Sequence, residues 1–332
     1  MMEAGGSIGQ DKMQRVYEEM KTPYKIGMVL SEEGCNIDCP NVFRTSDGQW
    51  KMVYAKHIPG QIREGYETWI ARSENLIHWE TEGKLLSKRT AGWDCCQADG
   101  GICLIDTQWG GDCRVRKYDN KYWMTYIGGA LPGYEPDPLN IGLAFSETME
   151  PGSWKRLDNP VLSTNDSDIR DFERETLYKS TVIYDEGKHL DAPFVMYYNA
   201  KQKGLWIERI GIAVSEDMIH WKRYGKGAVI ENERSDISNI AGDPQIIRFG
   251  SLWVMHYFIA QGGTAYDTFA CSEDLVNWTK WDGQPLIFPS EGYDRIYAHK
   301  PFVLKHEGIV YHFYCAVGDK GRGIALAVSH IS

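Results

Sequence analysis

Hydrophobic and polar positions alternate over short segments of the chain, and the strongest of these segments are rich in aromatic residues. Each follows a turn of Asp, Gly or Asn type, a pattern that predicts β-hairpins. The aromatic strands lie at 50–56, 122–128, 194–200, 252–258 and 310–316. A Ser-led segment follows each strand, with Ser at 73, 146, 215, 272 and 329, and the first four continue to a Trp six or eight residues later. The chain therefore contains a repeated unit of strands.

A third pattern precedes each aromatic strand and predicts the innermost strand of each unit. These segments are DCPNVF (38–43), DCRVRK (112–117), KSTVIY (179–184), DPQIIR (243–248) and HKPFVL (299–304). Four strands repeated five times are typical of a five-bladed β-propeller, an all-β fold. The last unit stops at its third strand, so we expect residues 24–31 to supply the missing fourth strand and close the ring. We expect one propeller domain over 22–332, preceded by a tail over 1–21 that contains a short helix.

Composition and net charge exclude some classes of binding partner. The net charge of the 332-residue chain is −10, which argues against nucleic acid and anionic membranes as partners. No apolar run approaches the ~20 residues needed to span a bilayer. The eight cysteines include no C-x-x-C pair, and the N-terminus has no apolar signal core, so we expect a cytoplasmic protein. A periplasmic location would apply if a leader had been trimmed, and the oligomeric state is left open.

The residues that begin the innermost strands of a propeller surround one mouth of its central channel. Here they are Asp38, Asp112, Lys179, Asp243 and His299. Glycoside cleavage fits such a set, because it needs one carboxylate to activate water or attack the anomeric carbon and an acid to protonate the leaving oxygen. Carboxylates crowded together also push their pKa values apart. The alternative is that these acids cap strand ends or bind an axial ion.

At these residues the chain resembles the five-bladed propeller glycoside hydrolase superfamily, which includes families 32, 43, 117 and 130. NIDCPNVF around Asp38 is similar to the first-blade segment that carries the base or nucleophile, and GGDCRV at Asp112 resembles the second-blade Asp-Pro-Arg segment. GDPQII at Asp243 occupies the place of the family 43 acid. YAHKPFV resembles the fifth-blade segment whose His holds an axial ion in family 43 and is the proposed acid in family 117. The resemblance implies that no cofactor is required. It also allows an axial calcium or other ion near His299.

These arguments predict a catalytic set in which Asp38 is the general base and Asp243 or His299 is the acid, with Asp112 assisting. Sugar rings stack on aromatic side chains in long loops, and charged groups bind sugar hydroxyls. Asp94 and Asp99 lie in the long loop 87–111 and could reach a bound sugar. The predicted substrate-binding residues are Trp109, Arg114, Glu175, Lys179, Tyr297 and Lys300.

The sequence thus predicts an exo-acting, inverting hydrolase of a small glycan. A glycoside phosphorylase is the first alternative, because Arg114, Lys179, His299 and Lys300 resemble the basic anion cradle of family 130. A non-catalytic glycan-binding propeller is the second. Dependence on inorganic phosphate separates the first two functions, and turnover separates both from the third.

Overall fold

The structure is a computed structural model, and it describes residues 7–204, 206–231 and 238–331. Its regular elements in this part of the chain are strands, apart from α1 (Gln10–Met20) and the short 3-10 helix η1 (Asp171–Glu173). Neither helix is long and apolar enough to cross a membrane. The prediction of an all-β chain is confirmed, and α1 lies within the predicted N-terminal tail.

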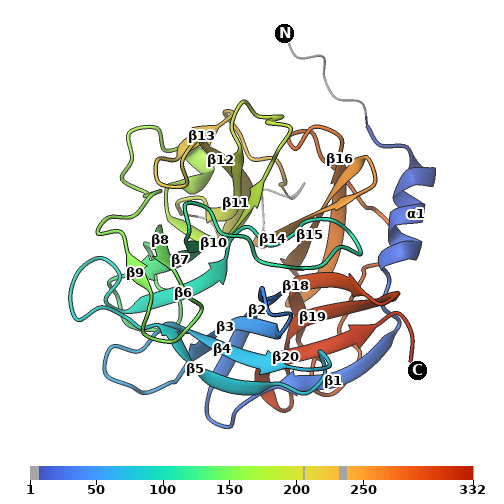
Figure 1. Cartoon of the computed structure of the whole chain (residues 1–332), viewed down its shortest axis with the longest axis horizontal. Coiled ribbons are helices and arrows are strands. Elements are labelled where there is room, and N and C mark those ends of the chain that lie inside the picture. The colour runs from blue at the N-terminus through green and yellow to red at the C-terminus, as the bar shows by residue number, and fades with distance from the viewer. Residues whose placement is uncertain (1–6, 205, 232–237, 332) are drawn as a thin grey trace.

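The strands pair antiparallel in consecutive groups arranged around a central axis (Figure 1). Short parallel pairings β4–β6, β12–β14 and β16–β18 connect neighbouring groups. The groups, from the inner strand outward, are β2 (Asn36–Arg44), β3 (Trp50–His57), β4 (Tyr66–Ser73) and β5 (Glu80–Leu86); β6 (Gln97–Ile102), β7 (Tyr122–Gly129), β8 (Asn140–Ser146) and β9 (Lys155–Arg156); β10 (Thr176–Tyr184), β11 (Phe194–Lys201), β12 (Ile207–Ser215) and β13 (Lys222–Tyr224); β14 (Asn239–Phe249), β15 (Leu252–Gln261), β16 (Thr264–Ser272) and β17 (Thr279–Lys280); and β18 (Tyr297–His306), β19 (Ile309–Gly318), β20 (Gly321–Val328) and β1 (Tyr24–Leu30).

The predicted aromatic strands are confirmed as β3, β7, β11, β15 and β19, the second strand of each group. A strand in this place is paired on both sides and covered on both faces, so large side chains there are removed from water. Tyr54, Trp123, Tyr197, Tyr257 and Tyr314 are among the largest fully buried side chains of the protein. The aromatic repeat is therefore the repeat of the core.

The Ser–Trp repeat is a hydrogen-bonded turn between the third and fourth strands. The hydroxyl of Ser215 accepts a hydrogen bond from the backbone N–H of Asp217. The Asp217 carboxylate accepts bonds from the N–H groups two and three residues later, at 2.9 and 2.8 Å. The Trp221 indole N–H then donates to the carbonyl three residues before it. Residues 73–79 and 272–278 form the same turn. The histidines within the repeated turn therefore have a structural role.

Like β10, the three inner strands β2, β14 and β18 have a bulge where they approach the axis. In each, the residue before a proline has a positive φ: 53° at Cys39, 49° at Asp243 and 62° at Lys300. Non-glycine residues adopt this conformation only where the surroundings impose it, commonly beside functional sites. The bulges align Cys39, Asp243 and Lys300 with one another, so the predicted equivalence of Asp38 with Asp243 is wrong by one position.

The prediction that residues 112–117 form the inner strand of the second group is also wrong, because β6 takes that place. The β6 sequence QADGGI includes two adjacent glycines and so has a weak strand signal. Gly100 is required by close packing, since a Cβ there would lie 2.4 Å from the Met124 sulfur. The glycines that allow β6 to pack closely therefore also weaken its strand signal in the sequence.

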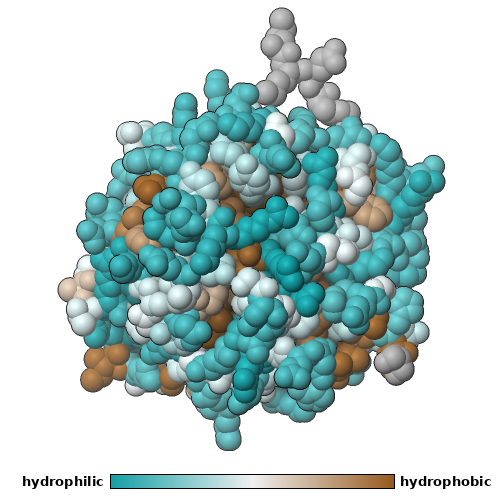
Figure 2. Space-filling view, in the orientation of Figure 1, coloured by the Kyte–Doolittle hydropathy of each residue, from teal (hydrophilic) through white to brown (hydrophobic). Residues whose placement is uncertain are grey.

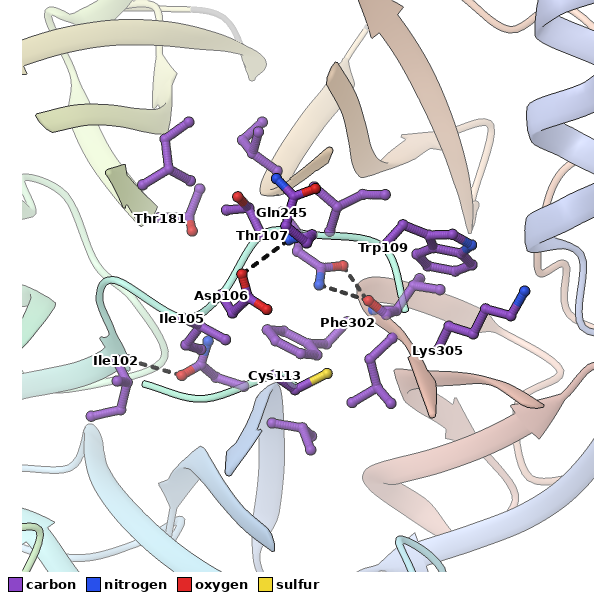
Figure 3. A pocket seen from close by; sticks show the side chains of 18 of the residues that line it. Ile102, Ile105, Asp106, Thr107, Trp109, Cys113, Thr181, Gln245, Phe302 and Lys305 are labelled. Atoms are coloured by element: carbon purple, nitrogen blue, oxygen red, sulfur yellow. Dashed lines mark hydrogen bonds between the residues drawn. The ribbon is translucent and has the colours of Figure 1, made fainter. Parts of the chain in front are cut away.

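The segment after β6 crosses the far end of the channel instead of lining it. Its backbone bonds to β14: the Trp109 N–H donates to the Arg248 carbonyl at 2.9 Å, and the Arg248 N–H donates to the Thr107 carbonyl at 2.7 Å. In the view of Figure 1 this segment runs in front of the axis. Figure 3 shows its side chains beside Gln245 and Phe302 of the inner strands. Figure 2 shows that this face is hydrophilic over most of its area.

Candidate active site

The side chains at the starts of the innermost strands line a cavity of about 300 Å³ on the axis. The inner strands run from this cavity toward the opposite end of the channel: Asp243 lines the cavity, whereas Ile247 of the same strand lines the far end. Among the predicted site residues, those on the cavity wall are Lys179, Asp243, Tyr297, His299 and Lys300.

Asp38 lies beneath the cavity wall and is fully buried. One carboxylate oxygen accepts a hydrogen bond from the Cys39 N–H at 3.0 Å. The other accepts bonds from Tyr66, from Lys300 at 3.1 Å and from Arg322. Burial opposes ionisation, but the charges of Lys300 and Arg322 outweigh it and hold the pKa of Asp38 well below its usual range. Asp38 is paired with two cations and does not line the cavity, which argues against its predicted role as general base.

The second group contributes Asp99, from β6, to the cavity. One oxygen of Asp99 accepts a bond from Lys179 at 2.6 Å, while the other is buried without a partner in the described part of the chain. Burial disfavours the Lys179 ammonium, yet the Asp99 charge raises the pKa of Lys179. This pair fills the place that the sequence assigned to Asp112. The unpartnered oxygen can accept a hydrogen bond from a ligand hydroxyl.

Asp243 and His299, the predicted acids, face the cavity from adjacent groups. Burial raises the pKa of Asp243, and the carboxylates of Asp38 and Asp99 act in the same direction against the nearby lysines. Burial lowers the pKa of His299 to about 3, and its Nδ1 donates to the Cys315 carbonyl at 3.1 Å. The imidazole of His299 is therefore neutral at neutral pH, so it cannot act as an imidazolium acid.

The surroundings of His299 do not fit the axial calcium that the resemblance implies. The side chains of Lys300 and Arg322 place positive charge near the imidazole. No group of three or more His, Cys, Asp or Glu side chains that could hold a metal ion occurs in the described residues. A cation here would meet the positive charges of an ammonium and a guanidinium and too few oxygen ligands.

Two glutamates that the sequence analysis missed complete the cavity wall. Glu208, near the start of β12, is buried and accepts hydrogen bonds on both oxygens, from the Trp206 indole at 2.9 Å and from the Asn199 amide at 2.8 Å. Burial raises the pKa of Glu208 to about 7, and the charge of Glu135 adds to the effect. The two neutral donors act in the opposite direction, because they stabilise the ionised form of Glu208.

Glu135 lies in the loop between β7 and β8, with a positive φ of 46°. No group in the described residues donates a hydrogen bond to its carboxyl group. Glu135 is partly buried, and this burial raises the pKa of its carboxyl group to about 7, while the neighbouring carboxylates oppose the effect of Lys300. A carboxyl group with this pKa and no donor is suited to hold a proton.

The remaining predicted residues lie away from the cavity. Asp112 and Arg114 follow the segment that crosses the far end, and their side chains are 50% and 48% exposed. Trp109 lines the far end of the channel (Figure 3) and donates to Glu19 at 2.9 Å. Glu175 accepts a bond from the backbone of Gly204 and does not line the cavity. Asp112, Arg114 and Trp109 were assigned to the site for one reason. The sequence analysis placed the inner strand of the second group at 112–117, whereas β6 takes that place.

Two solved structures match nearly the whole chain, one a complex of BT0996 with RGII and the other described as "Glycoside hydrolase". Each is 45% identical in sequence, has a TM-score of 0.93, and is matched over 98% of this chain and 96% of its own. The chain belongs to this glycoside hydrolase family. The resemblance to propeller glycoside hydrolases is thereby confirmed.

More distant relatives share the propeller-type fold of this glycoside hydrolase. A thermostable family-43 glycoside hydrolase has a TM-score of 0.66 at 17% identity, over 91% of each chain. Among curated proteins, a 1,2-beta-oligomannan phosphorylase from Thermoanaerobacter sp. (strain X514) is 30% identical over 137 residues. That match covers 38% of this chain and 43% of the phosphorylase, so it spans less than half of that protein's length. No family model matches the chain.

The cavity of this glycoside hydrolase combines three kinds of group. Glu135 and Glu208 are carboxyl groups with pKa values of about 7 in one cavity. Asp99 and Asp243 offer oxygen acceptors, and the cations Lys179, Lys300 and Arg322 offer donors. Such a set can bind sugar hydroxyls from several directions and carry a proton between two carboxyl groups.

Proposed function

We propose that the antiparallel groups are the five blades of a single propeller domain over residues 22–332, closed by β1. The pairing of β1 with β20 supports this closure, with Tyr24 opposite Val328 and Leu30 opposite Ile324. With β1 as its outer strand, the last blade has four strands like the others. The cavity then lies at the axis, where all blades contribute to it.

The enzyme in this proposal is an exo-acting glycoside hydrolase whose catalytic carboxyl groups are Glu135 and Glu208. The carrying observation is that two glutamates with pKa values of about 7 share the cavity. Glycosidases need one protonated and one ionised carboxyl group across the scissile bond. Glu135, without a donor, gives its proton to the glycosidic oxygen. Glu208, held by two donors, takes a proton from the attacking water or attacks the anomeric carbon itself.

The cavity volume supports exo action. It lies at the low end of the roughly 300–1,000 Å³ range of ligand pockets, which suits the terminal residue of a glycan. The substrate class is carbohydrate, in agreement with the RGII complex formed by the protein of 45% identity. Inversion of the anomeric centre stays a prediction, since it depends on the separation of the two carboxyl groups.

Water is favoured over phosphate as the acceptor, because the cavity cations are already engaged. Lys179 pairs with Asp99, and both Lys300 and Arg322 pair with Asp38. A phosphate group would have to compete with these carboxylates for its charge-assisted bonds. Phosphorolysis is the second candidate because of the match to a curated phosphorylase.

The test is product analysis with an RGII oligosaccharide in 18O-labelled water, with and without phosphate. Hydrolysis predicts release of a terminal sugar that carries the label, at a rate independent of phosphate. A sugar 1-phosphate formed only with phosphate would replace hydrolysis by phosphorolysis. Binding of the oligosaccharide without either product would indicate a glycan-binding protein. NMR of the first-formed anomer reports inversion or retention in the same experiment.

A further inference from the structure

Trp206 is the most exposed aromatic side chain on the cavity wall. It is 57% exposed and lines the cavity beside Glu208. Its indole N–H donates to Glu208 at 2.9 Å. A large aromatic surface left in water at the mouth of a binding cavity is typical of a contact that a ligand completes.

One face of the Trp206 ring is already supported by the protein. The Lys201 ammonium lies 4.8 Å from the ring centroid, and Lys201 itself is buried. Lys201 is fixed by an ion pair with Asp137, whose other oxygen accepts a bond from Thr176 at 2.6 Å. The indole is therefore held by Lys201 at its ring and by Glu208 at its N–H, with the rest of its surface exposed.

The same contacts join the two catalytic segments. Asp137 lies two residues after Glu135 in the loop between β7 and β8, and Trp206 lies two residues before Glu208. The Asp137–Lys201 pair and the Lys201–Trp206 contact thus connect the loop of one carboxyl group to the strand of the other. A sugar resting on the indole would contact an element that holds Glu208 in place.

We propose that Trp206 forms the binding platform for the sugar on the leaving-group side of the scissile bond and is also a positioning residue for Glu208. This inference rests on the proposed function. The terminal sugar fills the cavity, so the next residue of the glycan must pass the cavity mouth. There the indole offers an apolar face for stacking against the C–H face of a sugar ring. The enzyme is accordingly built for oligosaccharides whose leaving group is a sugar ring, rather than for glycosides of small alcohols.

The binding test uses an RGII oligosaccharide and its released terminal sugar, measured by calorimetry in a Glu135→Gln background. Trp206→Ala should weaken binding of the oligosaccharide about tenfold, corresponding to about 1.4 kcal/mol, and change binding of the terminal sugar less than twofold. Trp206→Phe should retain most of the oligosaccharide affinity. Tyr184→Ala, at an aromatic side chain 47% exposed away from the cavity, is the matched control and should change neither. Equal oligosaccharide affinities for Trp206→Ala and its parent would overturn the platform, and so would failure of the oligosaccharide to bind any variant.

The positioning role has its own readout in the pH profile. Trp206→Phe removes one of the two donors that favour ionised Glu208, so the pKa of Glu208 should rise. The acid limb of kcat/KM should then move to higher pH by at least about 0.5 unit, and an unmoved limb would refute the role. If wild type binds the oligosaccharide without turnover while Trp206→Ala still weakens binding, the proposed function fails and the platform stands.

Discussion

Replacing Asp38 by Asn tests whether this carboxylate is structural or catalytic. The change keeps the shape of the side chain and removes the charge shared by Lys300 and Arg322. The side chains of these two cations are only 9% and 14% exposed. Removing one partner of a buried ion pair costs about 3–5 kcal/mol, because the remaining charge is left without compensation. An unfolding entropy of about 2.1 cal/mol/K per residue gives roughly 0.7 kcal/mol/K for 332 residues, or about 1.4 °C per kcal/mol, so the thermal midpoint should fall by roughly 4–7 °C.

The assay is thermal unfolding followed by near-UV circular dichroism, with Asp112→Asn as a control at a carboxylate 50% exposed. Adding Arg322→Met to Asp38→Asn should recover part of the midpoint, because it removes one of the two uncompensated cations. The pKa of Asp38 is lowered in the folded state, so its stabilisation is present above the unfolded pKa of about 3.9 and is lost only as pH falls through the folded value. The difference between wild type and Asp38→Asn should therefore be constant from about pH 5 to 8. An unchanged midpoint with a 100-fold loss of turnover would refute this reasoning and restore Asp38 as a base.

Three further outcomes follow from the same structure. The pH profile of kcat/KM should be a narrow bell centred near 7, because the coupled pair Glu135 and Glu208, each with a pKa of about 7, must hold one proton between them; a plateau extending from pH 5 to 9 would contradict this. Asp112→Asn should leave kcat/KM within twofold of wild type in the same assay, since its carboxylate lies outside the cavity, whereas a tenfold loss would place it in the site. Gly100→Ala should lower stability by about 1–3 kcal/mol in thermal unfolding, because the new Cβ would lie 2.4 Å from the Met124 sulfur; Gly227→Ala, with nothing within 4 Å, should be near neutral, and equal midpoints for the two variants would refute the packing argument.

The repeat could be predicted because its causes are local. The Ser–Trp turn is made of hydrogen bonds between residues at most three apart, such as Asp217 to the N–H groups that follow it. The aromatic strands follow from the need to fill a core between sheets, as at Tyr197. Both leave recurring residues in successive units, so the sequence alone predicts the repeat and its aromatic strands.

The inner strands were harder to predict because their alignment depends on the bulge. The motifs Asp38-Cys39-Pro40 and Gly242-Asp243-Pro244 align at their prolines, which puts Asp38 one place before Asp243. That one-residue offset moves Asp38 beneath the cavity wall and leaves Asp243 on it. Aligning the two segments at their prolines gives the correct register, whereas aligning them at their aspartates does not.

The two glutamates could not be identified from pattern. Glu135 lies in the loop between β7 and β8, whose sequence is not repeated in the other units. Glu208 has a counterpart in Glu67, since each lies in the third strand opposite the next inner strand. Glu67, however, pairs with Lys84 on the outside of the cavity, while Glu208 is held by Trp206. Whether such a glutamate lines the cavity depends on its partners from distant segments, and only the folded chain shows these partners.

The most direct test of the central claim is turnover of an RGII oligosaccharide by Glu135→Gln and Glu208→Gln, measured beside wild type in buffer without phosphate. Each substitution keeps the side-chain size and removes one proton-transfer group. Both variants should lose at least about 100-fold in kcat, with thermal midpoints close to that of wild type. Turnover within threefold of wild type by either variant would show that Glu135 and Glu208 are not the catalytic pair.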